Sequence, residues 1–119
     1  MQSTSTPQSP PPEVPYTALL GQVIKAGRVA QRIEQAAMAA HLGLSQSAYS
    51  RLESGDTNMS VWQLRACALK LGTTVSAVTR NVEGLEQQLA AQNIKIVPEK
   101  KANPAAALIG LAILAAFLR

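Results

Sequence analysis

The chain has 119 residues, enough for one small domain with appendages but too few for two sizeable cores. Hydrophobic residues make up 47% of it and aromatic residues only 3%, a balance typical of packed helices rather than sheets. The net charge of +4 suits an anionic partner, either nucleic acid or an acidic membrane surface. A single cysteine, Cys67, excludes an internal disulfide framework.

The N-terminal segment, residues 1–15, is rich in Pro, Ser, Thr and Gln and is predicted to be a disordered tail. It carries neither a positive leader nor an apolar run, so we expect no secretory signal and a cytoplasmic, nucleoid-associated protein.

Five helices are predicted from apolar spacing and capping signals. The first covers residues 17–31 and breaks at residues 32–33, and the second covers 35–42, with Ala36, Ala39 and Leu42 facing inward. The third opens with Ser45 as its N-cap and runs through residue 54. A capping-box pattern at Ser60 opens the fourth, to residue 71, and the fifth runs from residue 74 to about 92. Residues 94–97 are predicted as a brief strand.

Residues 35–55 contain the most informative pattern, two short helices joined by a turn at Gly43. Ala39 is small enough for the helices to approach closely, and the second helix keeps one polar face. Such a helix fits the major groove, where Gln reads adenine and Arg reads guanine through paired hydrogen bonds. That polar face consists of Gln46, Ser47, Ser50 and Arg51.

This segment resembles the Cro/CI-type, or xenobiotic-response-element (XRE), family of helix-turn-helix regulators, and the resemblance extends from residue 20 to residue 78. Matches outside the turn make it specific, and they are Leu20-Gly21, Ile24, Arg28, Glu53, Leu64, Leu71-Gly72 and Thr74. The resemblance implies an all-α fold, a five-helix lambda repressor-like DNA-binding domain over residues 16–80. We expect an extended fifth helix and an apolar C-terminal helix in addition.

The resemblance also implies the role of individual residues. Arg28 and Glu53 would form a structural salt bridge between the first and third helices. Double-stranded DNA would be contacted by Gln35, Ser45, Gln46, Ser47, Ser50, Arg51, Thr57 and Asn58. Three departures from the family pattern, Glu34, Gly27 and Asp56, predict a modest non-specific affinity or leave a gap in the packing.

The residues after the domain are predicted to make it an oligomer. The segment 81–97 extends the fifth helix with apolar residues at spacings of three and four, and Val82, Leu85 and Leu89 are expected to meet a partner chain. The alternative is that this stripe packs back on its own domain. The preferred state is a homodimer or a higher homo-oligomer.

The end of the chain comprises a charged linker, residues 98–103, and an apolar segment, residues 104–119. As a helix, the fifteen uncharged residues 104–118 would span about 22 Å, short for a bilayer core of about 30 Å. We therefore favour packing in an oligomer core, through Leu108, Leu111 and Leu114, over membrane contact. Packing within the chain, over the apolar stripe of Trp62 and Leu69, is an alternative to the oligomer.

No catalytic pattern is present, and we expect neither an enzyme nor a cofactor or metal, since His41 has no ligand partner at a suitable spacing. The sequence predicts a dimeric repressor that reads a two-fold operator. Two alternatives are an antitoxin-type autoregulator that binds a toxin, and a membrane-tethered adaptor that uses the domain to bind a protein partner.

Overall fold

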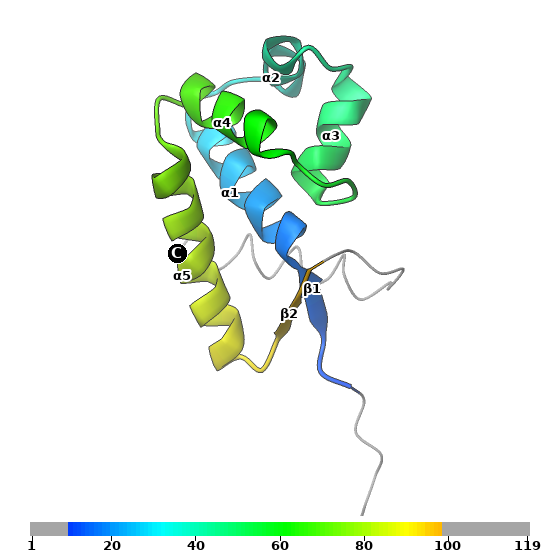
Figure 1. Cartoon of the computed structure of the whole chain (residues 1–119), viewed down its shortest axis with the longest axis vertical. Coiled ribbons are helices and arrows are strands. Elements are labelled where there is room, and N and C mark those ends of the chain that lie inside the picture. Colours follow the sequence, from blue (N-terminus) through cyan, green and yellow to red (C-terminus); the bar gives the residue numbers. More distant parts are fainter. Residues whose placement is uncertain (1–9, 99–119) are drawn as a thin grey trace, which may run out of the picture.

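The computed structural model describes residues 10–98, which form five helices and two short strands (Figure 1). In chain order the elements are β1 (Glu13–Pro15), α1 (Tyr16–Ala30), α2 (Gln35–Leu42), α3 (Gln46–Ser54), α4 (Val61–Lys70), α5 (Val75–Ala91) and β2 (Lys95–Val97). The predicted all-α helix-turn-helix fold is confirmed for this part of the chain. None of these helices is long and apolar enough to cross a membrane.

The helices begin where the capping signals predicted. The Ser45 side chain accepts a hydrogen bond of 3.1 Å from the amide of Ala48 at the start of α3. Ser60 and Gln63 form the expected reciprocal capping box at the start of α4, with bonds of 3.0 and 2.9 Å. Thr74 caps α5 in the same way. Each cap satisfies an amide that the first turn of a helix leaves without a partner.

Two glycines allow α1 and α3 to lie in direct contact. A Cβ atom on Gly21 would overlap the carbonyl oxygen of Glu53, so no larger residue fits where these helices cross. Gly55 ends α3 with a φ of 83°, and a Cβ there would lie 2.6 Å from Cα of Ala18. This close approach fixes the position of α3 relative to the rest of the domain.

One feature of α2 differs from its prediction. Ala39 is buried as expected, but Ala36 is exposed, and Met38 is buried in its place. The prediction that Ala36 faces inward is therefore wrong. Because α2 contacts both α3 and α4, its buried surface is centred on neighbouring positions 38 and 39 instead of on one stripe three residues apart.

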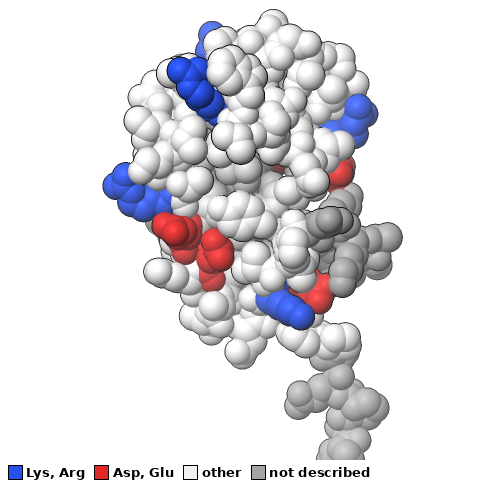
Figure 2. Space-filling model, in the orientation of Figure 1, with Lys and Arg blue, Asp and Glu red and all other residues white. Residues whose placement is uncertain are grey.

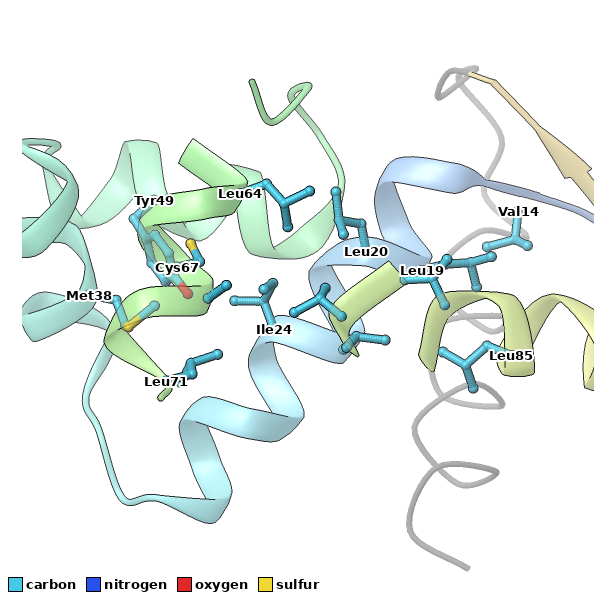
Figure 3. Close-up of a cluster of buried hydrophobic side chains, with 14 of the residues drawn as sticks. Val14, Leu19, Leu20, Ile24, Met38, Tyr49, Leu64, Cys67, Leu71 and Leu85 are labelled. Atoms are coloured by element: carbon cyan, nitrogen blue, oxygen red, sulfur yellow. The ribbon is translucent and has the colours of Figure 1, made fainter. Parts of the chain in front are cut away.

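The core is continuous from α2 to the two strands. At one end Met38, Tyr49 and Cys67 pack between α2, α3 and α4, as Figure 3 shows. At the other end Val14 and Leu85 pack around α1 (Figure 3). The expectation that Cys67 is a small core residue is confirmed, since it is fully buried.

The first strand is the main departure from the predicted N-terminal tail. Within the predicted 1–15 segment, residues 13–15 form β1, which pairs in parallel with β2 in the register Val14 to Ile96. Val14 is 1% exposed and belongs to the core. β2 itself confirms the brief strand expected near residues 94–97. A three-residue strand is stable here because its apolar side chain is buried against the helices.

The apolar stripe of α5 lies in the core of a single chain. Val82, Leu85 and Leu89 are 0, 4 and 2% exposed, so they offer no surface to a partner. The expected oligomer interface through these three residues is corrected, and the alternative of packing on the same domain holds. The remaining expected interface residues, Leu108, Leu111 and Leu114, lie outside the described residues.

Candidate nucleic-acid interface

The candidate interface centres on α3, which has two chemically distinct faces. Its apolar face, with Tyr49 and Leu52, is buried against the core. The opposite face carries the predicted base-reading residues: Gln46, Ser47 and Arg51 are exposed, and Ser50 is half-buried. The structure therefore places all four side chains on or beside one accessible face of a short helix, as a major-groove reader requires.

A buried carboxylate holds α3 in place. Glu53 is 2% exposed and accepts four hydrogen bonds. Arg28 of α1 donates two of them, from Nε to Oε2 at 2.8 Å and from Nη2 to Oε1 at 2.9 Å. Tyr49 donates from its hydroxyl at 2.7 Å, and Gln35 from Nε2 at 3.0 Å. The salt bridge between Arg28 and Glu53 expected from the resemblance is present, and it links α1, α2 and α3 through one side chain.

Burial and hydrogen bonding shift the pKa of Glu53 in opposite directions. Burial alone would raise the pKa of its carboxyl group, but the hydrogen bonds from Arg28, Gln35 and Tyr49 outweigh it, and the pKa lies below its usual value. The hydrogen bonds to Glu53 also raise the pKa of Arg28. Burial, followed by the hydrogen bond to Glu53, raises the pKa of Tyr49. At neutral pH the cluster therefore consists of an ionised pair, Arg28 and Glu53, to which the neutral Tyr49 and the amide of Gln35 donate further hydrogen bonds.

Gln35 is the predicted phosphate clamp at the start of α2. Its Nε2 atom donates one hydrogen to Glu53, and an amide nitrogen carries two. The second hydrogen has no partner in residues 10–98. Gln35 thus joins the scaffold and still has a donor for an outside acceptor, so its contact with DNA stays a prediction.

The loop after α3 is held close to the helix that it follows. The carbonyl of Arg51 accepts the amides of Asp56 and Thr57, at 2.9 and 3.3 Å. Thr17 of α1 donates to the carbonyl of Gly55 at 3.1 Å. The side chains of Thr57 and Asn58 are exposed, as backbone contacts would require. Their contact with DNA is not tested by the structure, nor is that of Ser45, whose hydroxyl caps α3.

Charge is distributed unevenly between the two ends of the molecule. Residues 16–80 contain seven basic residues (Lys and Arg) and three acidic ones (Asp and Glu). Residues 10–15 and 81–98 together contain one basic residue and three acidic ones. In the view of Figure 2 the basic side chains are scattered and do not merge into one patch. This arrangement favours an anionic partner at the helix-turn-helix end, with electrostatic attraction of moderate strength.

Three residues beside this face were missed by sequence reasoning. A pocket of about 150 Å³ between α1, α2 and α3 brings Gln22, Lys25 and Ser54 next to Gln35 and Ser50. Lys25 lies one helical turn before Arg28, and Ser54 lies one turn after Ser50. Those spacings are the only sequence signal that places Lys25 and Ser54 beside predicted site residues. The pocket itself depends on how the three helices pack, which the spacings do not predict.

The thiol of Cys67 is a structural group. Burial raises its pKa to about 11, with a smaller contribution from the charge of Glu53, so it is protonated at neutral pH. Within residues 10–98 no three His, Cys, Asp or Glu side chains gather as possible metal ligands.

Comparison with known proteins agrees with this geometry. Two crystal structures of the clp gene regulator ClgR from Corynebacterium glutamicum are similar to the chain. The first is 25% identical with a TM-score of 0.62, and the match covers 65% of this chain and 82% of that one. The second is 23% identical with a TM-score of 0.55, covers 58% and 90%, and supports the fold alone.

Two further findings concern the sequence. No match was found among curated proteins. The family model of the helix-turn-helix domain matches residues 19–81, which is more than half of the chain and contains all of α2, α3 and α4. The chain belongs to the helix-turn-helix domain family.

Proposed function

We propose that this protein is a sequence-specific DNA-binding transcriptional regulator that places α3 in the major groove. The observation that carries the proposal is the accessible polar face of α3, a helix that the hydrogen bonds of Glu53 link to α1 and α2. Side chains that read bases must be positioned to within a fraction of an ångström, and a helix fixed to two others meets that need.

The chemistry of the face is suited to reading base edges. In the major groove a Gln pairs with N6 and N7 of adenine, and an Arg with O6 and N7 of guanine. Gln46 and Arg51 supply these two groups, and Ser47 and Ser50 add short hydroxyls that accept or donate. Gln35, Thr57 and Asn58 flank the face, where they are suited to phosphate contacts that set the register.

Similarity to a gene regulator supports a role in transcription. The clp gene regulator ClgR shares the fold over most of its length. Neither the helix-turn-helix family nor the site suggests catalysis, so the proposed role is binding alone, in the cytoplasm where DNA is available. The regulator would repress by occupying its operator, in the manner of the XRE type.

A dimer on a two-fold site is part of the proposal. One α3 helix contacts only a few base pairs, and specific recognition generally combines two half-sites about 34 Å apart. Since the α5 stripe is buried in its own chain, the contacts between the two copies lie elsewhere. Apolar side chains exposed on α4, chiefly Trp62 and Leu69 at 71 and 57%, are available for them.

The test is the double substitution Gln46→Ala with Arg51→Ala. Bound sites would first be selected from random DNA, and affinity then measured by fluorescence anisotropy at fixed salt. Each paired base contact contributes about 1–3 kcal/mol of discrimination, so we expect the affinity for the selected site to fall at least about 30-fold.

The matched control is Gln88→Ala with Arg80→Ala, which removes the same groups from exposed positions on α5. We expect this variant to bind the selected site as the parent does. If the α3 variant keeps its affinity and its preference for the selected site, α3 is not the reading helix and the proposal is wrong.

A further inference from the structure

The pocket between α1, α2 and α3 carries an inference about how the domain holds the DNA backbone. Its volume of about 150 Å³ is several times the roughly 30 Å³ that one water molecule occupies in the liquid. Its lining is polar and comes from all three helices. The lining residues are Gln22, Lys25, Gln35, Ser50, Glu53 and Ser54.

Among these side chains, those of Lys25, Gln22 and Ser50 form no hydrogen bond or ion pair within residues 10–98. The ammonium group of Lys25 forms neither an ion pair nor a hydrogen bond there. Oε1 of Gln22 is buried and accepts no hydrogen bond. A buried polar atom without a partner costs free energy, so in solution such an atom is usually satisfied by water or a ligand.

The electrostatics of the pocket favour an anion despite the carboxylate in its wall. Glu53 is neutralised by Arg28 at 2.8 Å, and its two oxygens already accept four hydrogen bonds. The positive charge of Lys25 is therefore the uncompensated charge of the pocket. Donors complement it: Gln35 has a second hydrogen on Nε2, and Ser50 has its hydroxyl. Ser54 donates to the carbonyl of Arg51 and forms part of the wall.

The pocket also lies beside the proposed reading face. Ser47, Ser50 and Ser54 follow one another at spacings of three and four along α3, and therefore share a side of the helix. Gln35 stands at the N-terminal end of α2, where the helix dipole favours negative charge. An anion in the pocket would thus touch α3 on the side that continues its exposed polar face.

We propose that this pocket seats one phosphate of the DNA backbone, with Lys25 as its cation and Gln35 and Ser50 as its hydrogen-bond donors. A water molecule in the same space would donate one hydrogen to Oε1 of Gln22 and the other to the phosphate. The inference rests on the proposed function, because a single lysine with neutral donors holds a phosphodiester only when α3 is docked beside it.

The experiment is Lys25→Gln, measured as the dependence of log K on log salt for the selected site and for a duplex of random sequence. Loss of one phosphate contact lowers the magnitude of the slope by about 0.9 on both duplexes. At physiological salt we expect both affinities to fall by a similar factor, about ten-fold. Lys25→Arg, which keeps the charge, should restore the slope.

The matched control is Lys95→Gln, which removes the same charge from β2, an element that contributes no residue to the pocket. It should leave the slope unchanged. If the parent binds DNA and Lys25→Gln shows the same salt slope and the same affinity as the parent, the proposed phosphate site is wrong while the proposed function stands. If Lys25→Gln changes the sequence preference instead, Lys25 contacts a base and the proposed phosphate site is also wrong. If the parent binds no duplex, both the proposed function and the phosphate site are wrong.

Discussion

Glu53→Ala is expected to lower the free energy of unfolding by about 3–5 kcal/mol. The substitution removes the acceptor of four hydrogen bonds and leaves the guanidinium of Arg28 without its counter-ion. The hydroxyl of Tyr49, which is fully buried, also loses its acceptor. A domain of this size is typically stable by 5–15 kcal/mol, so the variant should lose much of its stability. Urea unfolding followed by far-ultraviolet circular dichroism measures the loss, since the exposed Trp62 is a poor fluorescent reporter.

The control for this substitution is Glu83→Ala, because Glu83 is an exposed glutamate on α5. We expect it to change the free energy of unfolding by less than about 0.5 kcal/mol. Glu53→Gln should fall between the two, since it keeps an acceptor for Tyr49 but not the charge that pairs with Arg28. Equal stability of the Glu53→Ala and Glu83→Ala variants would show that the cluster contributes nothing.

The same carboxylate predicts a dependence of stability on pH. The pKa of Glu53 is lower in the folded protein than in the unfolded chain, where the pKa of a glutamate is about 4.3. Its contribution is therefore fully present above that value and is lost as the pH falls through the folded pKa. Between pH 7 and pH 3 the parent should lose more stability than Glu53→Gln, measured by urea unfolding at each pH. Parallel curves for the two proteins would contradict the assignment.

Features set by local chemistry could be predicted from the sequence. Ser45, Ser60 and Thr74 cap the three helices that they were expected to cap, because a cap depends only on residues within one turn. The pairing of Arg28 with Glu53 joins residues far apart in the chain, and it was available only through the family resemblance. The sequence does not predict the hydrogen bond that Gln35 donates to the same carboxylate, because that contact depends on how α2 packs against α3.

Features set by packing between distant segments could not be predicted in the same way. An apolar stripe with spacings of three and four looks the same whether it faces a partner chain or its own domain. The α5 stripe packs mainly on α1 of its own chain. Val14 joins the same core from a segment whose Pro-rich composition masks a three-residue strand. The pocket around Lys25 likewise depends on the angle at which α1 meets α3, which the close approach at Gly21 sets.

Leu85→Ala tests whether the α5 stripe belongs to the core of one chain. Leu85 is 4% exposed and lies in the cluster that includes Leu19 and Val14, as Figure 3 shows. Truncation of a buried leucine removes its transfer free energy and leaves a cavity, so we expect a loss of about 2–5 kcal/mol. Since the contacts are within one chain, this loss should be the same at every protein concentration.

The matched control is Val29→Ala, which also shortens an apolar side chain but one that is 56% exposed on α1. It should cost less than about 0.5 kcal/mol. Urea unfolding at protein concentrations a hundred-fold apart, with sedimentation of the folded proteins, separates the two possibilities. If Leu85→Ala dissociated an oligomer and left the stability of the separated chains unchanged, the stripe would be an interface after all. A loss of stability that does not vary with concentration places Leu85 in the core and leaves any dimer to form through other surfaces.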